Sequence, residues 1–236
     1  MIQRILFLFF FYLGAIVVCV LFLPGLFLPQ KIILYGGKIL GHWSKFCLEI
    51  FLSTKIIVKG KEKILSDKKF FIASAHQSQF ETFFLQSIFN CPVFILKKEL
   101  LNIPIFGWYL RKIGSISIDR NKITKDNLGF SDQIKKHVEN SNRPVIIFPQ
   151  ATRVDTLDRS PFKKGVKRLY QELNIFCQPV ALNSGNVWPK NGKLSSNKTL
   201  IVSILDPIGP EMEPQEFYDT LQKRIYNEID YIINPS

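Results

Sequence analysis

The chain has 236 residues, of which 47% are hydrophobic, and its 31 basic against 19 acidic residues give a net charge of +12. This length fits one domain of ordinary size with an appended segment. The positive charge favours an anionic partner: phospholipid headgroups, a phosphorylated substrate or nucleic acid. The spacing of the cysteines fits neither a metal centre nor a disulfide framework, which argues against zinc-finger and disulfide-rich classes of protein.

The N-terminal segment is predicted to attach the protein to a membrane. Residues 5–29 include no charged side chain, and a bilayer core is crossed by about 20 apolar residues. A cleaved signal peptide is the alternative, but no clear small-residue cleavage site ends the run. Pro24-Gly25 interrupts it, so a kinked span and a re-entrant hairpin are both open. Basic residues follow among apolar ones, as expected beside an anionic surface; they are Lys31, Lys38 and Lys45.

Beyond residue 53, short apolar runs alternate with helical stretches. Strands are predicted at Lys55–Val58, Phe70–Ala73, Val93–Leu96, Ser115–Ile118, Val145–Phe148, Phe176–Leu182 and Leu200–Leu205. Helices are predicted at 79–90, 103–113, 124–140, 164–173 and 214–233. This alternation is typical of an α/β fold with helices flanking a mostly parallel central sheet. We expect a helical membrane anchor over residues 1–52 and an α/β domain over residues 53–236.

His76 and Glu81 are the strongest candidates for catalysis, because an imidazole held by a carboxylate can act as a general base toward an alcohol. Five residues within one α-helix would place the two side chains about 140° apart. The pair can therefore meet only if His76 precedes the helix and Glu81 lies in its first turn. The segment from Ser78 to Glu81 has the S-x-x-E form of a capping box, which favours this arrangement. In the alternative interpretation, Glu81 only caps the helix and His76 is a loop residue.

Basic and polar residues recur where the predicted strands end. They are Lys97 after the third strand, Gly114 and Arg120 around the fourth, and Gln150, Thr152 and Arg153 after the fifth. Ligands of open α/β sheets bind at the carboxyl ends of the strands, and arginine and lysine suit a phosphate group. The sequence therefore predicts a phosphate site beside His76. Solvated surface charges are the alternative for any one of these cations.

Four ordered segments between residues 53 and 210 resemble the motifs of the 1-acyl-sn-glycerol-3-phosphate (lysophosphatidic acid) acyltransferases. Residues 76–81 are similar to the H-x4-D motif, with Glu81 in place of Asp, and residues 114–120 to G-x-x-F-I-D-R. Residues 148–153 are similar to F-P-E-G-T-R, with F-K-x-G following at 162–165. Residues 179–185 are similar to a fourth block of the V-P-V-A-L type. Four blocks in order behind an apolar N-terminus are specific to this family, in its bacterial type.

The chain departs from the family pattern at a few positions. Glu81 lengthens the arm of the usual Asp but keeps its carboxylate. Gln150 replaces a Glu, and Ala151 replaces a Gly that takes positive φ more easily, so the turn there is expected to differ slightly. Ser117 replaces an aromatic residue. These changes bear on the choice of substrate more than on the reaction.

The resemblance implies a membrane-bound enzyme that acylates the sn-2 hydroxyl of lysophosphatidic acid and forms phosphatidic acid, with acyl-CoA or acyl-carrier protein as the donor. It implies that His76, oriented by Glu81, removes the hydroxyl proton, and that the oxygen attacks the thioester without a covalent acyl-enzyme. Implied ligands of the substrate phosphate are Lys97, Arg120 and Arg153. The other implied substrate-binding residues are Gly114, Gln150 and Thr152, the last a candidate for the oxyanion.

The same resemblance implies the surroundings of the enzyme. We expect an anionic phospholipid membrane as a partner and the inner cell membrane as the location, with the catalytic domain facing the cytoplasm. We expect no metal, no bound cofactor and no nucleic acid, since no known nucleic-acid motif occurs. Two alternatives stay open: an acyltransferase for glycerol 3-phosphate, another lysophospholipid or another lipid acceptor, and a membrane-tethered binder of anionic lipid or nucleic acid without catalysis.

Overall fold

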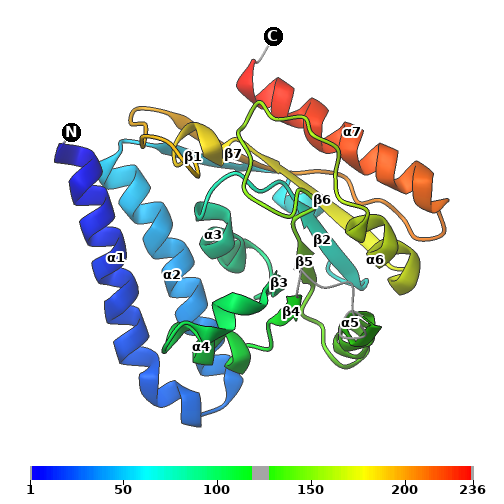
Figure 1. Cartoon of the computed structure of the whole chain (residues 1–236). Coiled ribbons are helices and arrows are strands. Elements are labelled where there is room, and N and C mark those ends of the chain that lie inside the picture. The colour runs from blue at the N-terminus through cyan, green and yellow to red at the C-terminus, as the bar shows by residue number, and fades with distance from the viewer. Residues whose placement is uncertain (1, 119–127, 235–236) are drawn as a thin grey trace. The chain divides into compact units, whose positions relative to one another are not determined.

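The structure, a computed structural model, describes residues 2–118 and 128–234, and the side chains of residues 128–130 are not described (Figure 1). The chain forms two compact units. The first comprises Met1–Phe51 and Thr82–Val145, and the second comprises Leu52–Glu81 and Ile146–Ser236. The predicted domain boundary after residue 52 stays a prediction.

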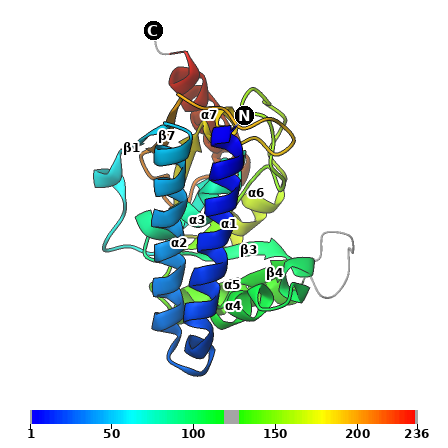
Figure 2. The same ribbon diagram turned by 90° about the vertical axis from the view of Figure 1, so that its left-hand side faces the viewer.

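The first unit begins with a pair of adjacent helices. Helix α1 (Ile2–Phe22) leads through a 3-10 turn, η1 (Leu23–Phe27), into α2 (Gln30–Phe51), which runs back beside it (Figures 1 and 2). Gly14 makes their close approach possible, because a Cβ there would lie 2.1 Å from the indole nitrogen of Trp43. That indole donates a hydrogen bond to the Phe10 carbonyl at 3.2 Å. The apolar N-terminal helix predicted from the sequence is therefore present.

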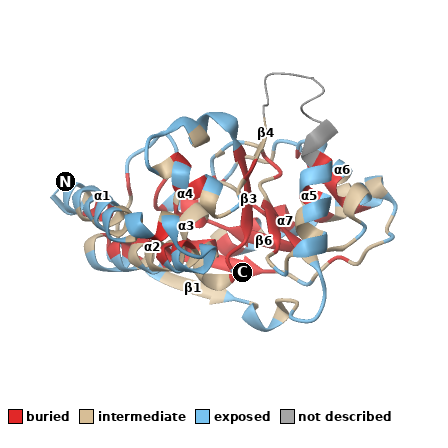
Figure 3. Cartoon of the chain, turned by 90° about the horizontal axis from the view of Figure 1, so that it is seen from below, coloured by how far each residue is buried: buried red, intermediate tan, exposed pale blue. Residues whose placement is uncertain are grey.

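Helix α1 presents most of its apolar side chains outward. Only two of them, Phe7 and Phe11, are buried. The stretch from Ile2 to Phe27 has a mean hydropathy of 3.0 and is long enough to cross a membrane, and it is the one such helix among the described residues. Figure 3 shows α1 mostly exposed. An exposed apolar surface of this kind is typical of a site that contacts a membrane or another protein.

The remainder of the first unit carries two parallel strands and short helices. Strands β3 (Val93–Lys97) and β4 (Ile116–Ile118) pair in parallel. The other elements are the greater part of α3 (Phe80–Ile88), η3 (Lys98–Asn102), α4 (Phe106–Lys112) and α5 (Leu128–Asn140). Residues 124–127 of the predicted helix 124–140 lie outside the described residues. The helix predicted at 103–113 begins later, because Ile105 takes a φ of 62° in a tight turn after Pro104.

The second unit is built on the larger part of the sheet. Its strands lie in the order β1 (Lys55–Lys59), β7 (Thr199–Ile204), β6 (Phe176–Leu182) and β2 (Phe70–Ser74). The pairs β1·β7 and β2·β6 are parallel, whereas β6·β7 is antiparallel. Strand β5 (Val145–Ile147) begins where the first unit ends. With β3·β4 also parallel, the predicted α/β fold with a mostly parallel sheet is confirmed.

The core of the second unit follows from its apolar periodicity. Strands β2 and β6 are buried along most of their length, as Figure 3 shows for β6, and this is typical of strands covered on both faces. Helix α7 (Pro214–Ile233) packs on β6, and α6 (Gly165–Leu173) packs on α7. The apolar stripe of α7 is buried as predicted; it consists of Phe217, Leu221, Ile225, Ile229 and Ile232.

Candidate active site

His76 lies where the chain leaves the sheet of the second unit. Strand β2 ends at Ser74, and the Ala75 N–H still donates to the Val180 carbonyl of β6 at 2.9 Å. Helix α3 begins at Phe80. The sequence predicted this position for His76, in the turn between a buried strand and a helix.

The two candidate catalytic side chains form a pair. His76 Nδ1 lies 2.9 Å from Glu81 Oε1, and the His76 side chain is 16% exposed while that of Glu81 is fully buried. The imidazole also stacks on the Phe148 ring, with 4.1 Å between the centroids and 19° between the planes. With Nδ1–H donating to the carboxylate, the Nε2 lone pair of a neutral ring is available to accept a proton. This pair has the geometry of an oriented general base.

Glu81 also caps the helix that carries it. Its Oε1 accepts hydrogen bonds from the Gln77 and Ser78 N–H groups, each at 2.7 Å. The Ser78 hydroxyl accepts from the Phe80 N–H at 3.1 Å. The predicted capping box and the histidine–carboxylate pair therefore coexist, since one oxygen atom serves both.

The segment after β5 holds the backbone of His76 on both sides. The Gln150 Oε1 accepts from the His76 N–H at 2.8 Å, and the Val154 N–H donates to the His76 carbonyl at 3.0 Å. Gln150 is 5% exposed. Its contact with the histidine backbone is one of positioning, and its predicted contact with substrate stays a prediction.

The turn between these contacts contains a residue in the left-handed backbone conformation. Ala151 has a φ of 60°, and its N–H donates to the Phe148 carbonyl at 2.8 Å. Alanine at the position of the family's glycine therefore adopts the conformation for which glycine is suited, at a cost of about 1–2 kcal/mol. We expected the turn to differ slightly, and its conformation remains one that glycine favours.

Thr152 and Arg153 follow directly and reach the surface. Thr152 is exposed and Arg153 is half-buried. The Lys190 ammonium donates to the Thr152 hydroxyl at 3.1 Å, which brings a further cation to this segment. The sequence did not single out Lys190, because its loop carries no motif.

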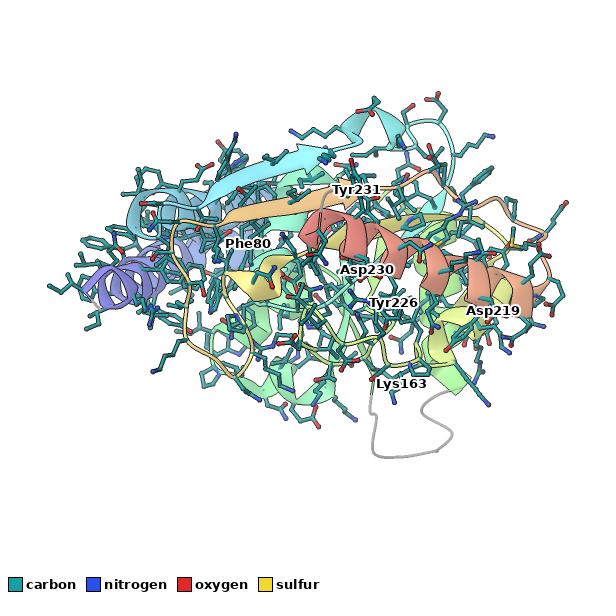
Figure 4. All side chains as sticks on the ribbon, turned by 90° about the horizontal axis from the view of Figure 1, so that it is seen from above. Phe80, Lys163, Asp219, Tyr226, Asp230 and Tyr231 are labelled. Carbon is teal, nitrogen blue, oxygen red and sulfur yellow. The ribbon has the colours of Figure 1, made fainter. Side chains whose placement is uncertain are left out.

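The loop that continues this segment contacts α7 through Tyr226 and Asp230, which are labelled on that helix in Figure 4. The Tyr226 hydroxyl donates to the Ser160 carbonyl at 2.5 Å. The Arg159 guanidinium lies 5.2 Å from the Tyr226 ring centroid and 2.5 Å from Asp230 Oδ1. Burial raises the pKa of Tyr226 to about 12. The loop that follows Arg153 is thereby fixed to a packed helix.

Two of the predicted site residues belong to the first unit, and a third is not described. Lys97 is the exposed last residue of β3, in the first unit. Gly114, in the same unit, has a φ of 75° between α4 and β4, which explains the glycine on conformational grounds alone. Arg120 lies outside the described residues. The substrate-binding roles of these residues stay predictions.

The sequence did not indicate one contact of the dyad and two contacts of the neighbouring Gln77. The Ser184 hydroxyl donates to Glu81 Oε2 at 2.8 Å. The Gln77 Oε1 accepts from the Gly185 N–H and from the Thr156 hydroxyl, both at 3.1 Å. Ser184 and Gly185 belong to the fourth block, but nothing local in that block indicates which side chain they would meet.

The family follows from comparison with known proteins. The family model described as Acyltransferase matches residues 55–183, which is more than half of the chain and includes the His76–Glu81 pair. The chain belongs to this acyltransferase family.

Several curated relatives carry the name 1-acyl-sn-glycerol-3-phosphate acyltransferase. The protein of Pseudomonas aeruginosa is 32% identical over 74% of this chain and 66% of its own length. That of Saccharomyces cerevisiae is 31% identical over 75% of this chain and 61% of its own length. That of Helicobacter pylori is 30% identical, over 65% of both chains. This chain thus spans less than two thirds of the length of these relatives.

The fold is also that of a solved structure. The crystal structure of the 1-acyl-sn-glycerophosphate (LPA) acyltransferase from Thermotoga maritima superposes with a TM-score of 0.81. The match covers 100% of this chain and 98% of the other at 21% sequence identity. At this level of identity the likeness establishes the fold.

Proposed function

We propose that this protein is a membrane-bound 1-acylglycerol-3-phosphate acyltransferase. It transfers a fatty acyl group from acyl-CoA or acyl-carrier protein to the sn-2 hydroxyl of lysophosphatidic acid, and the product is phosphatidic acid. The observation that carries the proposal is the 2.9 Å contact between the partly exposed His76 and the fully buried Glu81. The names of the curated relatives support the choice of acceptor.

The chemistry needs one base and no covalent enzyme intermediate. His76 Nε2 takes the proton of the sn-2 hydroxyl while its oxygen forms a bond to the thioester carbonyl carbon. The tetrahedral intermediate then expels the thiolate as the C–S bond breaks, and the imidazolium returns the proton to the sulfur. The Glu81 carboxylate stabilises the imidazolium between these steps. General-base catalysis of this kind contributes about 10²–10⁴ in rate.

Cations beside this base suit the acceptor's phosphate. Arg153 follows the segment that holds the His76 backbone, and Lys190 adds a positive charge at Thr152. An arginine fork and a lysine point charge bind phosphate in complementary ways. In this proposal Lys97 and Arg120 are further phosphate ligands, of which Arg120 belongs to the second motif.

The exposed apolar side chains of α1 suit attachment to a membrane. In this proposal it is the inner membrane, with the catalytic residues on the cytoplasmic side, as the sequence resemblance implies. A lysine within bilayer hydrocarbon costs about 2.5–3.5 kcal/mol. Phe9 and Ile16 are 58% and 60% exposed on α1. We expect the Phe9→Lys plus Ile16→Lys protein to stay in the supernatant when wild type pellets with phosphatidylglycerol vesicles. Leucine at both positions is the matched control, and equal pelleting of the lysine variant would contradict attachment through α1.

The experiment that tests the activity is an acyl-transfer assay with purified protein and a panel of acceptors. Lysophosphatidic acid, glycerol 3-phosphate and other lysophospholipids are each offered with acyl-CoA and with acyl-carrier protein. We expect transfer to lysophosphatidic acid, its loss in His76→Ala, and its retention in His42→Ala, which alters an exposed histidine of α2. Wild-type rates in His76→Ala would refute the mechanism, and preference for another acceptor would change the substrate.

A further inference from the structure

The two oxygen atoms of the Glu81 carboxylate have different hydrogen-bond partners. Oε1 meets the His76 ring and two backbone N–H groups. Oε2 accepts the Ser184 hydroxyl at 2.8 Å. Both Glu81 and Ser184 are 0% exposed, so water does not readily replace this hydroxyl. Contacts at Oε1 alone fix one atom, whereas contacts at both oxygens fix the plane of the carboxylate.

Ser184 is itself held by its neighbours in the chain. The Asn183 side chain accepts from the Ile201 N–H at 2.8 Å and donates to the Thr199 carbonyl at 3.2 Å, which joins the loop to β7. The Gly185 N–H donates to the Gln77 side chain at 3.1 Å. A Cβ on Gly185 would lie 2.5 Å from Thr156 Oγ1, so only glycine permits this approach. The contacts of Asn183 and Gly185 thus hold the segment on both sides of Ser184 and determine where its hydroxyl lies.

We propose that Ser184 is a positioning residue of the acyl-transfer reaction, acting on His76 through Glu81. The inference rests on the proposed function. The Ser184 hydroxyl holds the carboxylate in the plane that accepts Nδ1–H, and the carboxylate in turn holds Nε2 toward the acceptor hydroxyl. Loss of the hydroxyl leaves Oε2 buried without its donor, so the carboxylate rotates and the base is misplaced. The consequence falls on the chemical step and leaves substrate binding intact.

The same unit offers a matched control. The Ser203 hydroxyl of β7 donates to Glu228 Oε1 of α7 at 2.6 Å, and Ser203 is 4% exposed. This serine–carboxylate pair resembles Ser184–Glu81 in chemistry, and Ser203 is nearly as buried as Ser184, but Glu228 is half-buried and the pair does not include the partner of His76. Removal of the Ser203 hydroxyl is expected to cost no more stability than removal of the Ser184 hydroxyl. Only removal of the Ser184 hydroxyl is expected to slow acyl transfer.

The test compares kcat, KM and Tm of Ser184→Ala and Ser203→Ala with wild type, using lysophosphatidic acid and the better acyl donor. We expect kcat of Ser184→Ala to fall about tenfold with KM unchanged, which corresponds to a loss of about 1.4 kcal/mol of transition-state stabilisation. We expect kcat of Ser203→Ala to stay within about twofold, because the hydroxyl partner of Ser203 is Glu228 and not the carboxylate that orients His76. A folded Ser184→Ala protein with wild-type kcat would overturn the inference, as would equal losses in both variants.

A second pair of variants separates the hydroxyl from packing, and it decides the matter if Ser184→Ala fails to fold. Ser184→Thr and Ser184→Val have the same shape, and only threonine keeps the donor. Higher kcat in the threonine protein supports the inference, and equal kcat in the two refutes it. Wild-type protein that transfers no acyl group would instead refute the proposed function itself, so the two failures are distinguishable.

Discussion

Replacing Glu81 by glutamine removes the charge of the dyad while keeping its hydrogen bonds. The Gln77 and Ser78 N–H groups both point at Oε1, each at 2.7 Å, so an amide must place its oxygen there. That oxygen also accepts from His76 Nδ1, which preserves the ring orientation. The amide nitrogen then lies at the position of Oε2, where the Ser184 hydroxyl can turn to accept its hydrogen bond. The Gln77, Ser78 and His76 donors keep their acceptor, whereas the proton of the Ser184 hydroxyl loses the acceptor that Oε2 provided.

The expected magnitudes follow from this geometry. Hydrogen bonds to a charged group contribute about 1.5–3 kcal/mol and neutral ones about 1 kcal/mol, so we expect Glu81→Gln to lose about 1–2 kcal/mol of stability. A neutral amide does not stabilise the imidazolium, so we expect kcat to fall about 10²–10⁴-fold. Glu81→Ala is less informative, because it leaves the two N–H groups and the Ser184 hydroxyl unpaired at about 1–3 kcal/mol each.

The assay pairs steady-state acyl transfer with urea unfolding on the same preparation. Glu228→Gln is the control, because it neutralises a glutamate that accepts a serine hydroxyl on α7, away from the dyad. We expect that variant to transfer acyl groups like wild type. A folded Glu81→Gln protein whose kcat lies within about threefold of wild type would refute charge stabilisation of His76, since even modest base catalysis contributes more.

Three further predictions concern stability. Ala151→Gly relieves a φ of 60° and is expected to raise the free energy of unfolding by about 0.5–1 kcal/mol; an unchanged urea midpoint would contradict strain at this turn. Gly185→Ala places a methyl 2.5 Å from Thr156 Oγ1 and is expected to cost about 1–3 kcal/mol, part of which the added Thr156→Ala change should restore in thermal unfolding. The pKa of Tyr226 is raised by burial to about 12, so the folded protein keeps a proton that the unfolded chain loses above about pH 10. Stability therefore falls as pH rises from 10 to 12, and a Tyr226→Phe protein with an equally steep fall would exclude this cause.

Helices and strands could be predicted where they depend on the apolar pattern of residues that are close in the sequence. Strand β6 and helix α7 have the predicted bounds. The strand is an apolar run, and the helix has apolar residues at a spacing of about 3.6, so both patterns can be read from the local sequence. The start of α4 was wrong because the turn at Ile105 depends on a positive φ that no glycine announces.

The site was predictable only in part, for a similar reason. His76 and Glu81 could be joined by helical geometry, since they are five residues apart. Ser184 meets Glu81 across a sequence separation of 103 residues, and Lys190 meets Thr152 across 38. Such contacts depend on the order of the strands and the path of the loops. The periodicity of a single sequence does not predict either of them.

Because one oxygen of Glu81 both caps α3 and contacts His76, substitution of Glu81 affects the fold more than substitution of His76 does. Glu81 starts a helix and fills a buried polar site, so its removal threatens the fold. The His76 side chain does not cap a helix. Its removal therefore leaves the cap, the contact between Glu81 and Ser184, and the cations around Thr152 in place. A His76→Ala protein is therefore the form in which acceptor and thioester could be held together without reacting, and thus the natural starting point for capturing the complex in a crystal.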